Sequence, residues 1–261
     1  MPESDPAAVC PECDGRGWVV AADGGAGSAR PCLCRHADVV PRLVAASGVP
    51  PRYLGCNLGN FQVEQQGVRD QLLAARSVAS RYVEEFLGPD GRRRESGLLF
   101  IGPPGAGKTH LATATLLEIV RRYRVRGRFV DFTSLIFQIQ STFDAATQET
   151  KQGVMEPVMS ADLLVLDELG AQKPTPWVSE VLYLVLNTRY TRRLPTLFTT
   201  NYRLEDGAAG ASLDRGAGPP ARELLSHRIP AMLVSRLWEM ARPVVIEAAD
   251  FRQQVKSHQH A

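Results

Sequence analysis

Leu98-Leu99-Phe100-Ile101-Gly102-Pro103-Pro104-Gly105-Ala106-Gly107-Lys108-Thr109 is the stretch that decides the fold of this chain. Four apolar residues, typical of a buried strand, run directly into the pattern G-x-x-x-x-G-K-T. Glycines let the backbone turn so that successive N–H groups point inward, and a helix that follows adds its positive N-terminal end. The stretch therefore predicts a loop that cradles the phosphates of a nucleoside triphosphate.

The residue types in this loop fit that chemistry one by one. Lys108 is one of only four lysines among 30 basic residues, and it is expected to reach the β- and γ-phosphates. The Thr109 hydroxyl is expected to bind the magnesium ion that bridges them. A purely structural glycine turn is the alternative. The residues expected to contact the nucleotide are Gly102, Pro103, Pro104, Gly105, Ala106, Gly107, Lys108, Thr109 and His110.

Composition limits what kind of protein this is. The chain has 261 residues, of which 44% are hydrophobic and 22% charged, which predicts one globular main domain with room for a small appendage. A formal charge of +2 is too small to indicate nucleic-acid binding by itself, although arginines cluster at 92–94 and 121–128. No run approaches 18 apolar residues and the first residues are acidic, so a soluble cytoplasmic protein is expected.

Four of the five cysteines lie before residue 35 and have metal-ligand spacing. A C-x-x-C pair and a C-x-C pair supply four sulfurs, enough for a closed tetrahedral zinc site. Zinc would provide folding energy of about 10 to 16 kcal/mol to a segment too short for its own core. Alternate residues of a strand point to opposite faces, so His36 is an alternative ligand to one cysteine; free thiols are the other reading. The predicted ligands are Cys10, Cys13, Cys32 and Cys34, and Cys56 is expected to be a buried or incidental thiol.

Changes in composition divide the chain into four parts. We expect a zinc-binding leader over 1–40, a proline- and glycine-rich linker and lead-in over 41–60, a nucleotide-binding domain over 61–255 and a tail over 256–261. Apolar spacing predicts helices over 68–87, 110–123, 134–152 and 177–192. Short apolar runs predict strands over 98–101, 129–132, 163–166, 196–199 and 243–246. This alternation predicts a three-layer α/β fold around a five-stranded parallel sheet.

The strand over 163–166 ends in Asp167-Glu168. The carboxyl ends of parallel strands meet at one edge of the sheet, so both side chains should lie beside the phosphate loop. Asp167 would then hold magnesium, directly or through water, and Glu168 would polarise the attacking water as a general base. An ordinary solvated turn is the alternative for an Asp-Glu pair taken alone.

Three motifs together resemble the DnaC/IstB branch of the AAA+ ATPases over about residues 50–255. They are the phosphate loop through Ala112, Leu166-Asp167-Glu168-Leu169-Gly170, and Thr199-Thr200-Asn201-Tyr202. The cysteine-bearing leader is also similar to that of many DnaC-type loaders, which favours a helicase loader over a transposition helper. The resemblance implies an AAA+ fold without a full helical lid.

The resemblance also implies roles for three further residues. Asn201 matches the sensor asparagine that orients the hydrolytic water. Arg236 matches the arginine finger that acts on the ATP of a neighbouring subunit, and Arg252 matches the second sensor arginine, which contacts nucleotide in its own subunit. A long Gly/Ala-rich insertion over 205–220 leaves Arg222 and Arg228 as alternatives to Arg236.

The function implied is an ATP-hydrolysing protein that assembles side by side and loads or remodels a replicative DNA helicase on single-stranded DNA. ATP, Mg²⁺ and Zn²⁺ are the implied cofactors. The alternatives are a transposition helper that binds double-stranded DNA and recruits a transposase, and a nucleotide-gated adaptor with little hydrolysis. Weak, salt-sensitive DNA contact is expected from the arginines at 121, 122, 124, 126 and 128.

Overall fold

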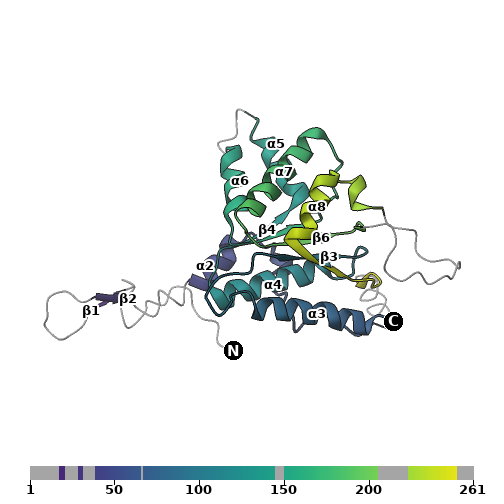
Figure 1. The fold of residues 1–261 in the computed structure, drawn as a ribbon. Coiled ribbons are helices and arrows are strands. Elements are labelled where there is room, and N and C mark those ends of the chain that lie inside the picture. The colour runs from purple at the N-terminus through teal and green to yellow at the C-terminus, as the bar shows by residue number, and fades with distance from the viewer. Residues whose placement is uncertain are drawn as a thin grey trace.

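The computed structural model describes residues 18–20, 29–31, 39–65, 67–144, 150–204 and 223–251. Its main part is a five-stranded sheet with helices on both faces (Figure 1). The strands are β3 (Gly97–Ile101), β4 (Gly127–Asp131), β5 (Leu163–Asp167), β6 (Thr196–Thr200) and β7 (Ala241–Val245). The helices of eight residues or more are α2 (Val39–Ala46), α3 (Arg69–Glu84), α4 (Lys108–Tyr123), α5 (Phe132–Ser141), α6 (Lys151–Ser160), α7 (Pro176–Thr191) and α8 (Ala231–Met240).

All neighbouring strands of the large sheet are parallel, in the order β4-β5-β6-β3-β7. The predicted five-stranded parallel sheet is therefore confirmed. β3 lies between β6 and β7, both of which come later in the chain. The loop that follows β3 consequently emerges next to the end of β6, one strand away from the end of β5.

The strands read as continuous apolar runs because both faces of the sheet are covered. Leu98 and Phe100 of β3 belong to a core with α3 and α4, whereas Leu99 and Ile101 belong to a second core with α5, α6, α7 and α8. In Figure 1, α3 and α4 cover one face and α5 to α8 the other. Successive residues of one strand thus anchor opposite helical layers.

The single helix expected over 134–152 is wrong, because the structure has two helices there. Asp131 Oδ1 accepts a hydrogen bond from the Ser134 N–H at 2.7 Å, and Thr150 Oγ1 accepts one from the Gly153 N–H at 3.1 Å. Each side chain satisfies an orphan N–H at a helix start, so α5 and α6 each have their own N-cap. The sequence analysis also missed α2 and α8.

The proline-rich segment over 41–60 contains most of α2, which begins two residues earlier, and a short 3-10 helix, η1 (Pro51–Tyr53). Val49, Leu58 and Phe61 are buried in the core that α3 and α4 share. Residues 39–65, which we call the lead segment, therefore pack onto the main domain. The domain boundaries stay a prediction.

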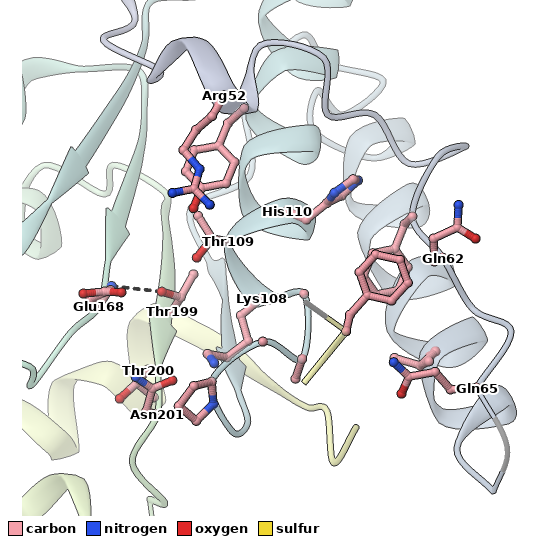
Figure 2. Close-up of a pocket in the computed structure, with 18 of the residues that line it drawn as sticks. Arg52, Gln62, Gln65, Lys108, Thr109, His110, Glu168, Thr199, Thr200 and Asn201 are labelled. Carbon is pink, nitrogen blue, oxygen red and sulfur yellow. Dashed lines mark hydrogen bonds between the residues drawn. The ribbon is translucent and has the colours of Figure 1, made fainter. Parts of the chain in front are cut away.

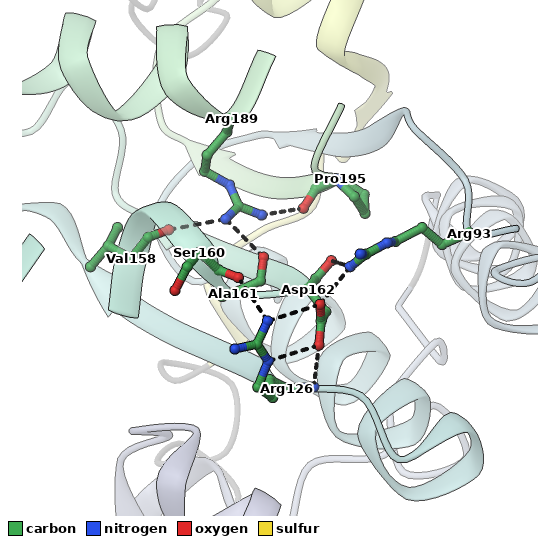
Figure 3. Close-up of polar contacts among 8 residues, drawn as sticks. All are labelled: Arg93, Arg126, Val158, Ser160, Ala161, Asp162, Arg189 and Pro195. Carbon is green, nitrogen blue, oxygen red and sulfur yellow. Dashed lines mark hydrogen bonds and ion pairs between the residues drawn. The ribbon is translucent and has the colours of Figure 1, made fainter. Parts of the chain in front are cut away.

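Arg189 is fully buried and ties α7 to the other elements (Figure 3). Its guanidinium donates to the carbonyl oxygens of Val158 and Ala161, both at 3.0 Å, and of Pro195 at 2.7 Å. Nε donates to Thr196 Oγ1 at 2.8 Å. Burial lowers the pKa of this guanidinium to about 9, which still leaves it charged at neutral pH. All three guanidinium nitrogens have partners, which is what a buried charge requires.

Near the N-terminus, β1 (Trp18–Val20) pairs antiparallel with β2 (Ala29–Pro31). The predicted zinc ligands Cys10, Cys13, Cys32 and Cys34, and the alternative ligand His36, lie outside the described residues. So do Arg222 and Arg252. In the part of the chain that the structure describes, no helix has the length and apolar character needed to cross a membrane.

Candidate nucleotide-binding site

The phosphate loop joins the end of β3 to the start of α4. Gly105 and Gly107 have φ angles of 78° and 89°, in the left-handed region that glycine tolerates, and Gly107 is the N-cap of α4. A Cβ atom on Gly105 would lie 1.9 Å from Asp250 Oδ1, and one on Gly107 would lie 2.5 Å from Phe61. Both the backbone conformation and the close neighbours therefore require glycine at these positions.

A cavity of about 500 Å³ lies over this loop (Figure 2). The loop and the ends of β5 and β6 form one side, and the lead segment forms another. The residues that line it are Arg52, Tyr53, Asn60, Phe61, Gln62, Gln65, Leu72, Pro104, Gly105, Ala106, Gly107, Lys108, Thr109, His110, Glu168, Thr199, Thr200, Asn201 and Phe251. The volume suits a nucleotide-sized ligand.

Lys108 is 7% exposed, and its Nζ donates a hydrogen bond to the Pro103 carbonyl oxygen at 2.7 Å. The amine is therefore held within the loop that the sequence predicts to be anion-binding. A phosphate that enters the loop would offer this buried ammonium a charged acceptor in place of a carbonyl oxygen.

Two threonines hold the carboxylate of Asp167. The Thr109 hydroxyl donates to Asp167 Oδ1 at 2.9 Å, and the Thr199 hydroxyl donates to the same oxygen at 2.5 Å. These residues come from the start of α4 and the ends of β5 and β6, so three separate elements meet at one carboxylate. The sequence analysis predicted that Thr109 and Asp167 would lie together, and the geometry brings them together.

Burial raises the pKa of the Asp167 carboxyl to about 6. The hydrogen bonds from Thr199 and Thr109 act in the opposite direction, and the negative charges of Glu168 and Asp131 add to the increase. Desolvation thus outweighs the two hydrogen bonds. A cation next to Asp167 would favour the ionised carboxylate.

Magnesium prefers oxygen ligands and keeps several waters, with one or two carboxylates and substrate phosphates. Thr109 Oγ1 and the Asp167 carboxylate supply such oxygens beside the phosphate loop, so the residues fit this ion. Within the described ranges, no group of three or more His, Cys, Asp or Glu residues could hold a metal by itself. This donor set accordingly suits an ion that arrives with a phosphate ligand.

Glu168 is exposed, lines the cavity and has a φ of 57°, which is uncommon for a residue with a side chain. Its N–H donates to Thr199 Oγ1 at 2.9 Å, and the next N–H, of Leu169, donates to the Thr199 carbonyl oxygen at 2.8 Å. These bonds hold the strained turn against β6. Asn201, just beyond β6, lines the same cavity (Figure 2).

His110 lines the cavity, but its ring is bonded to the lead segment. Nε2 lies 3.1 Å from the Asn57 carbonyl oxygen, which can only accept, so Nε2 carries the proton. Nδ1 then accepts from the Cys56 thiol, whose sulfur is 3.6 Å away. Cys56 is buried, as expected, and burial raises the pKa of its thiol.

The sequence analysis missed the residues that the lead segment contributes to the cavity, including Tyr53, Phe61 and Gln65. Prolines and glycines dominated the interpretation of its residues 41–60, and no role was assigned to Phe61 or Gln65. Phe61, Val63 and Gln65 alternate with exposed residues, and all three are buried. That period of two was the available signal for an extended, half-buried segment.

Arg236 does not line this cavity. Its guanidinium carbon lies 5.0 Å from the ring centre of Tyr183 and 5.8 Å from that of Tyr190, and no partner for its buried Nη1 exists among the described residues. Arg228, the alternative, donates to the Gly170 carbonyl oxygen at 2.9 Å and to that of Ala171 at 3.1 Å. Arg228 is thus tied to its own chain through the backbone.

The family of IstB-like ATP binding proteins matches residues 55–210, which include the phosphate loop, Asp167 and Asn201. The chain belongs to this family. The resemblance noted in the sequence is confirmed, and the sheet has the AAA+ arrangement.

Several curated proteins and solved structures are similar to this chain. The replicative helicase loader DnaC of Escherichia coli strain K12 is 29% identical over 168 residues, which are 63% of each chain. YqaM of Bacillus subtilis strain 168 is 28% identical over 180 residues, 67% of this chain and 55% of that protein. A crystal structure of the DnaC helicase loader has a TM-score of 0.60 and 30% identity, covering 76% of this chain and all of that one. The chain thus spans 55% to 63% of the length of these two curated relatives.

Proposed function

We propose that this protein binds ATP with Mg²⁺ in the cavity over the phosphate loop and hydrolyses it. The observation that carries the proposal is the meeting of Thr109, Asp167 and Thr199 beside the buried amine of Lys108. Bound Mg²⁺ would neutralise the phosphate charge that develops during hydrolysis. Thr109 and Asp167 are the residues that would hold it.

In this proposal the other residues position the triphosphate and the water. The loop from Gly102 to Gly107 binds the phosphates through backbone N–H groups, and Lys108 adds its charge. Glu168 accepts a proton from the attacking water, and Asn201 orients that water. Glu168 and Asp167 thus have different roles in the proposal. The exposure of the Glu168 carboxylate, on a turn held by Thr199, supports its role as the base, whereas Asp167 is buried.

An unpaired acceptor supports a base site in the lead segment. Gln65 is buried and lines the cavity, and in the described part of the chain no donor reaches its Oε1. Leaving such an acceptor unpaired costs free energy, and the amino group of adenine is a donor that would satisfy it. Phe61 and Tyr53 supply aromatic surface for the base.

We further propose that the protein loads or remodels a replicative DNA helicase on single-stranded DNA. The similarity to the DnaC helicase loader supports this role. Zinc bound by Cys10, Cys13, Cys32 and Cys34 would stabilise the leader that engages the helicase. The antiparallel pairing of Trp18 with Pro31 supports this zinc site. One cysteine pair comes before Trp18 in the sequence and the other directly after Pro31, so the pairing brings the two ends that carry them together.

Arg236 is proposed to act on the ATP of a neighbouring copy, and Arg252 on nucleotide in its own subunit. The position of Arg236 outside the cavity of its own chain supports a role between subunits. The second candidate is a transposition helper that binds double-stranded DNA. It is kept because the family that matches this chain is described as IstB-like, and transposition helpers belong to the same DnaC/IstB branch.

Two substitutions test the nucleotide proposal. Lys108→Ala should abolish binding of a fluorescent ATP analogue, and Glu168→Gln should keep binding but lose phosphate release. Unchanged affinity in the first variant would refute the site, and wild-type turnover in the second would remove Glu168 as the base. A pull-down with replicative helicase, with and without residues 1–38, tests the partner, because the deletion spares α2 and the buried residues Val49 and Leu58. Capture of a transposase instead would favour the second candidate.

A further inference from the structure

The edge of the sheet opposite the cavity is strongly basic. We define the basic edge as the segments that lead into the strands, at 81–97, 121–128, 160–163, 192–196 and 241–242. They hold twelve arginines and five acidic residues, a formal charge of +7, whereas the whole chain carries +2. The remainder of the chain is therefore net acidic, and Asp131, Asp167 and Glu168 lie at the nucleotide edge.

Contacts between these segments make the basic edge one continuous surface. Asp162 pairs with Arg93 at 2.7 Å and with Arg126 at 3.2 Å, joining the turns before β3, β4 and β5 (Figure 3). Arg193, before β6, pairs with Glu95 at 3.0 Å. Parallel pairing brings the starts of the strands to the same edge.

Helix dipoles alone do not explain this charge. The C-termini of α3, α4 and α7 lie at the basic edge, and each carries about half a negative charge, which favours basic residues nearby. Three such ends amount to roughly −1.5. This is far less than +7, and the effect is confined to the last turn of each helix, so it does not account for Arg92–Arg94 or Arg242.

The basic edge also has a hollow. A cavity of about 350 Å³ is lined by Arg81, Arg94 and Arg242, together with Glu85, which pairs with Arg94. Arg81, Arg242 and Arg192 are exposed, and within the described residues the guanidinium groups of these three make no ion pair with an acidic side chain and no hydrogen bond. Three guanidinium groups are thus available to an anionic ligand.

We propose that the basic edge binds the sugar-phosphate backbone of double-stranded nucleic acid. Guanidinium groups match phosphate oxygens in planar, bidentate geometry, and several of them along one surface suit a repeating phosphate chain. Single strands are bound largely by stacking on aromatic side chains. The exposed large apolar side chains of the described residues, such as Phe137, Tyr183 and Trp238, all lie outside the basic edge.

This inference does not depend on ATP hydrolysis, because the basic edge and the cavity over the phosphate loop lie at opposite ends of the strands. It also differs from the single-stranded DNA proposed as the substrate for loading. A duplex is the DNA of the second candidate function too, and the inference adds the surface of this chain that contacts it. The acidic groups at the nucleotide edge would repel a duplex, so the charge distribution directs it to the basic edge.

The test is fluorescence anisotropy with a labelled 30-base-pair DNA duplex and the full chain. Replacing Arg81, Arg192 and Arg242 with Gln should raise Kd at least about tenfold. The slope of log Kd against log salt concentration should fall by roughly two to three, because up to three phosphate contacts are lost. The control replaces Arg69, Lys151 and Lys173, three exposed basic residues outside the basic edge, with Gln. It removes the same charge and should change Kd less than twofold.

Binding of a fluorescent ATP analogue by each variant reports folding, and Lys108→Ala should retain duplex binding. Arg192→Glu alone, on the turn after α7, gives a second test and should weaken binding severalfold. Equal weakening by the control triple, affinity independent of salt, or tighter binding of a 30-nucleotide single strand would each overturn the proposal.

Discussion

Replacing Asp167 with Asn should stabilise the nucleotide-free protein at neutral pH, although it removes a residue proposed to hold magnesium. Burial raises the pKa of this carboxyl from 3.8 to about 6. At about 1.4 kcal/mol per pKa unit, ionisation costs the folded protein roughly 3 kcal/mol relative to the unfolded chain. Asn has the same shape without the charge, so it avoids this cost.

The sign of the pH dependence follows from the raised pKa. Below about pH 4 the carboxyl is protonated in both states, so the substitution should change stability little. Between about pH 4 and 6 the unfolded state ionises first, and the wild-type protein loses stability relative to the variant. Above about pH 7 the advantage of Asn should approach its limit of roughly 3 kcal/mol, less whatever the changed hydrogen bonds cost.

Urea unfolding in the presence of a chelator, at pH 4.5 and pH 7.5, measures this difference. Glu156→Gln, which removes an exposed carboxylate, is the control and should have little effect at either pH. Adding Mg²⁺ and ATP should stabilise the wild-type protein but not the Asp167→Asn variant. A variant less stable than the wild type at pH 7.5, or a gain that does not change with pH, would refute the reasoning.

Four further predictions concern other sites. Gln65→Leu should weaken ATP binding about three- to tenfold through one lost hydrogen bond, but leave the affinity for purine riboside triphosphate, which lacks the amino group, unchanged. Arg189→Met should lower the free energy of unfolding by roughly 2 to 4 kcal/mol in urea titration, because it leaves buried carbonyl oxygens unpaired; wild-type stability would contradict this. Metal analysis should find about one zinc per chain, lost when Cys10 and Cys13 become Ser. Arg236→Ala should reduce ATP turnover but not ATP binding, and mixing it with Glu168→Gln should restore some activity if the finger acts between subunits.

The sequence determined much of the main domain. The pattern from Leu98 to Thr109 predicted a strand, a glycine loop and a helix, because such a loop needs left-handed backbone that few residues other than glycine adopt. The apolar run ending in Asp167 predicted a second buried strand in the same sheet. Parallel topology then required both ends to meet at one edge, as they do.

The sequence was ambiguous where local signals compete with distant contacts. One apolar period covered 134–152, but the caps at Asp131 and Thr150 divide the region into two helices. Prolines and glycines favoured a linker over 41–60, yet Val49 and Leu58 are buried in the core with α3 and α4. The free energy gained by burying these side chains outweighs the local preference for a linker.

Local patterns in the sequence determined the phosphate loop, the sheet and the positions of Asp167 and Glu168, because each depends on the backbone freedom or burial of a short segment. Only the tertiary structure decided that Gln65 lines the cavity and has a buried, unpaired oxygen, that Thr199 holds Asp167, and that scattered arginines form one basic edge. These features join residues from different elements, and the sequence does not encode the distances between them locally.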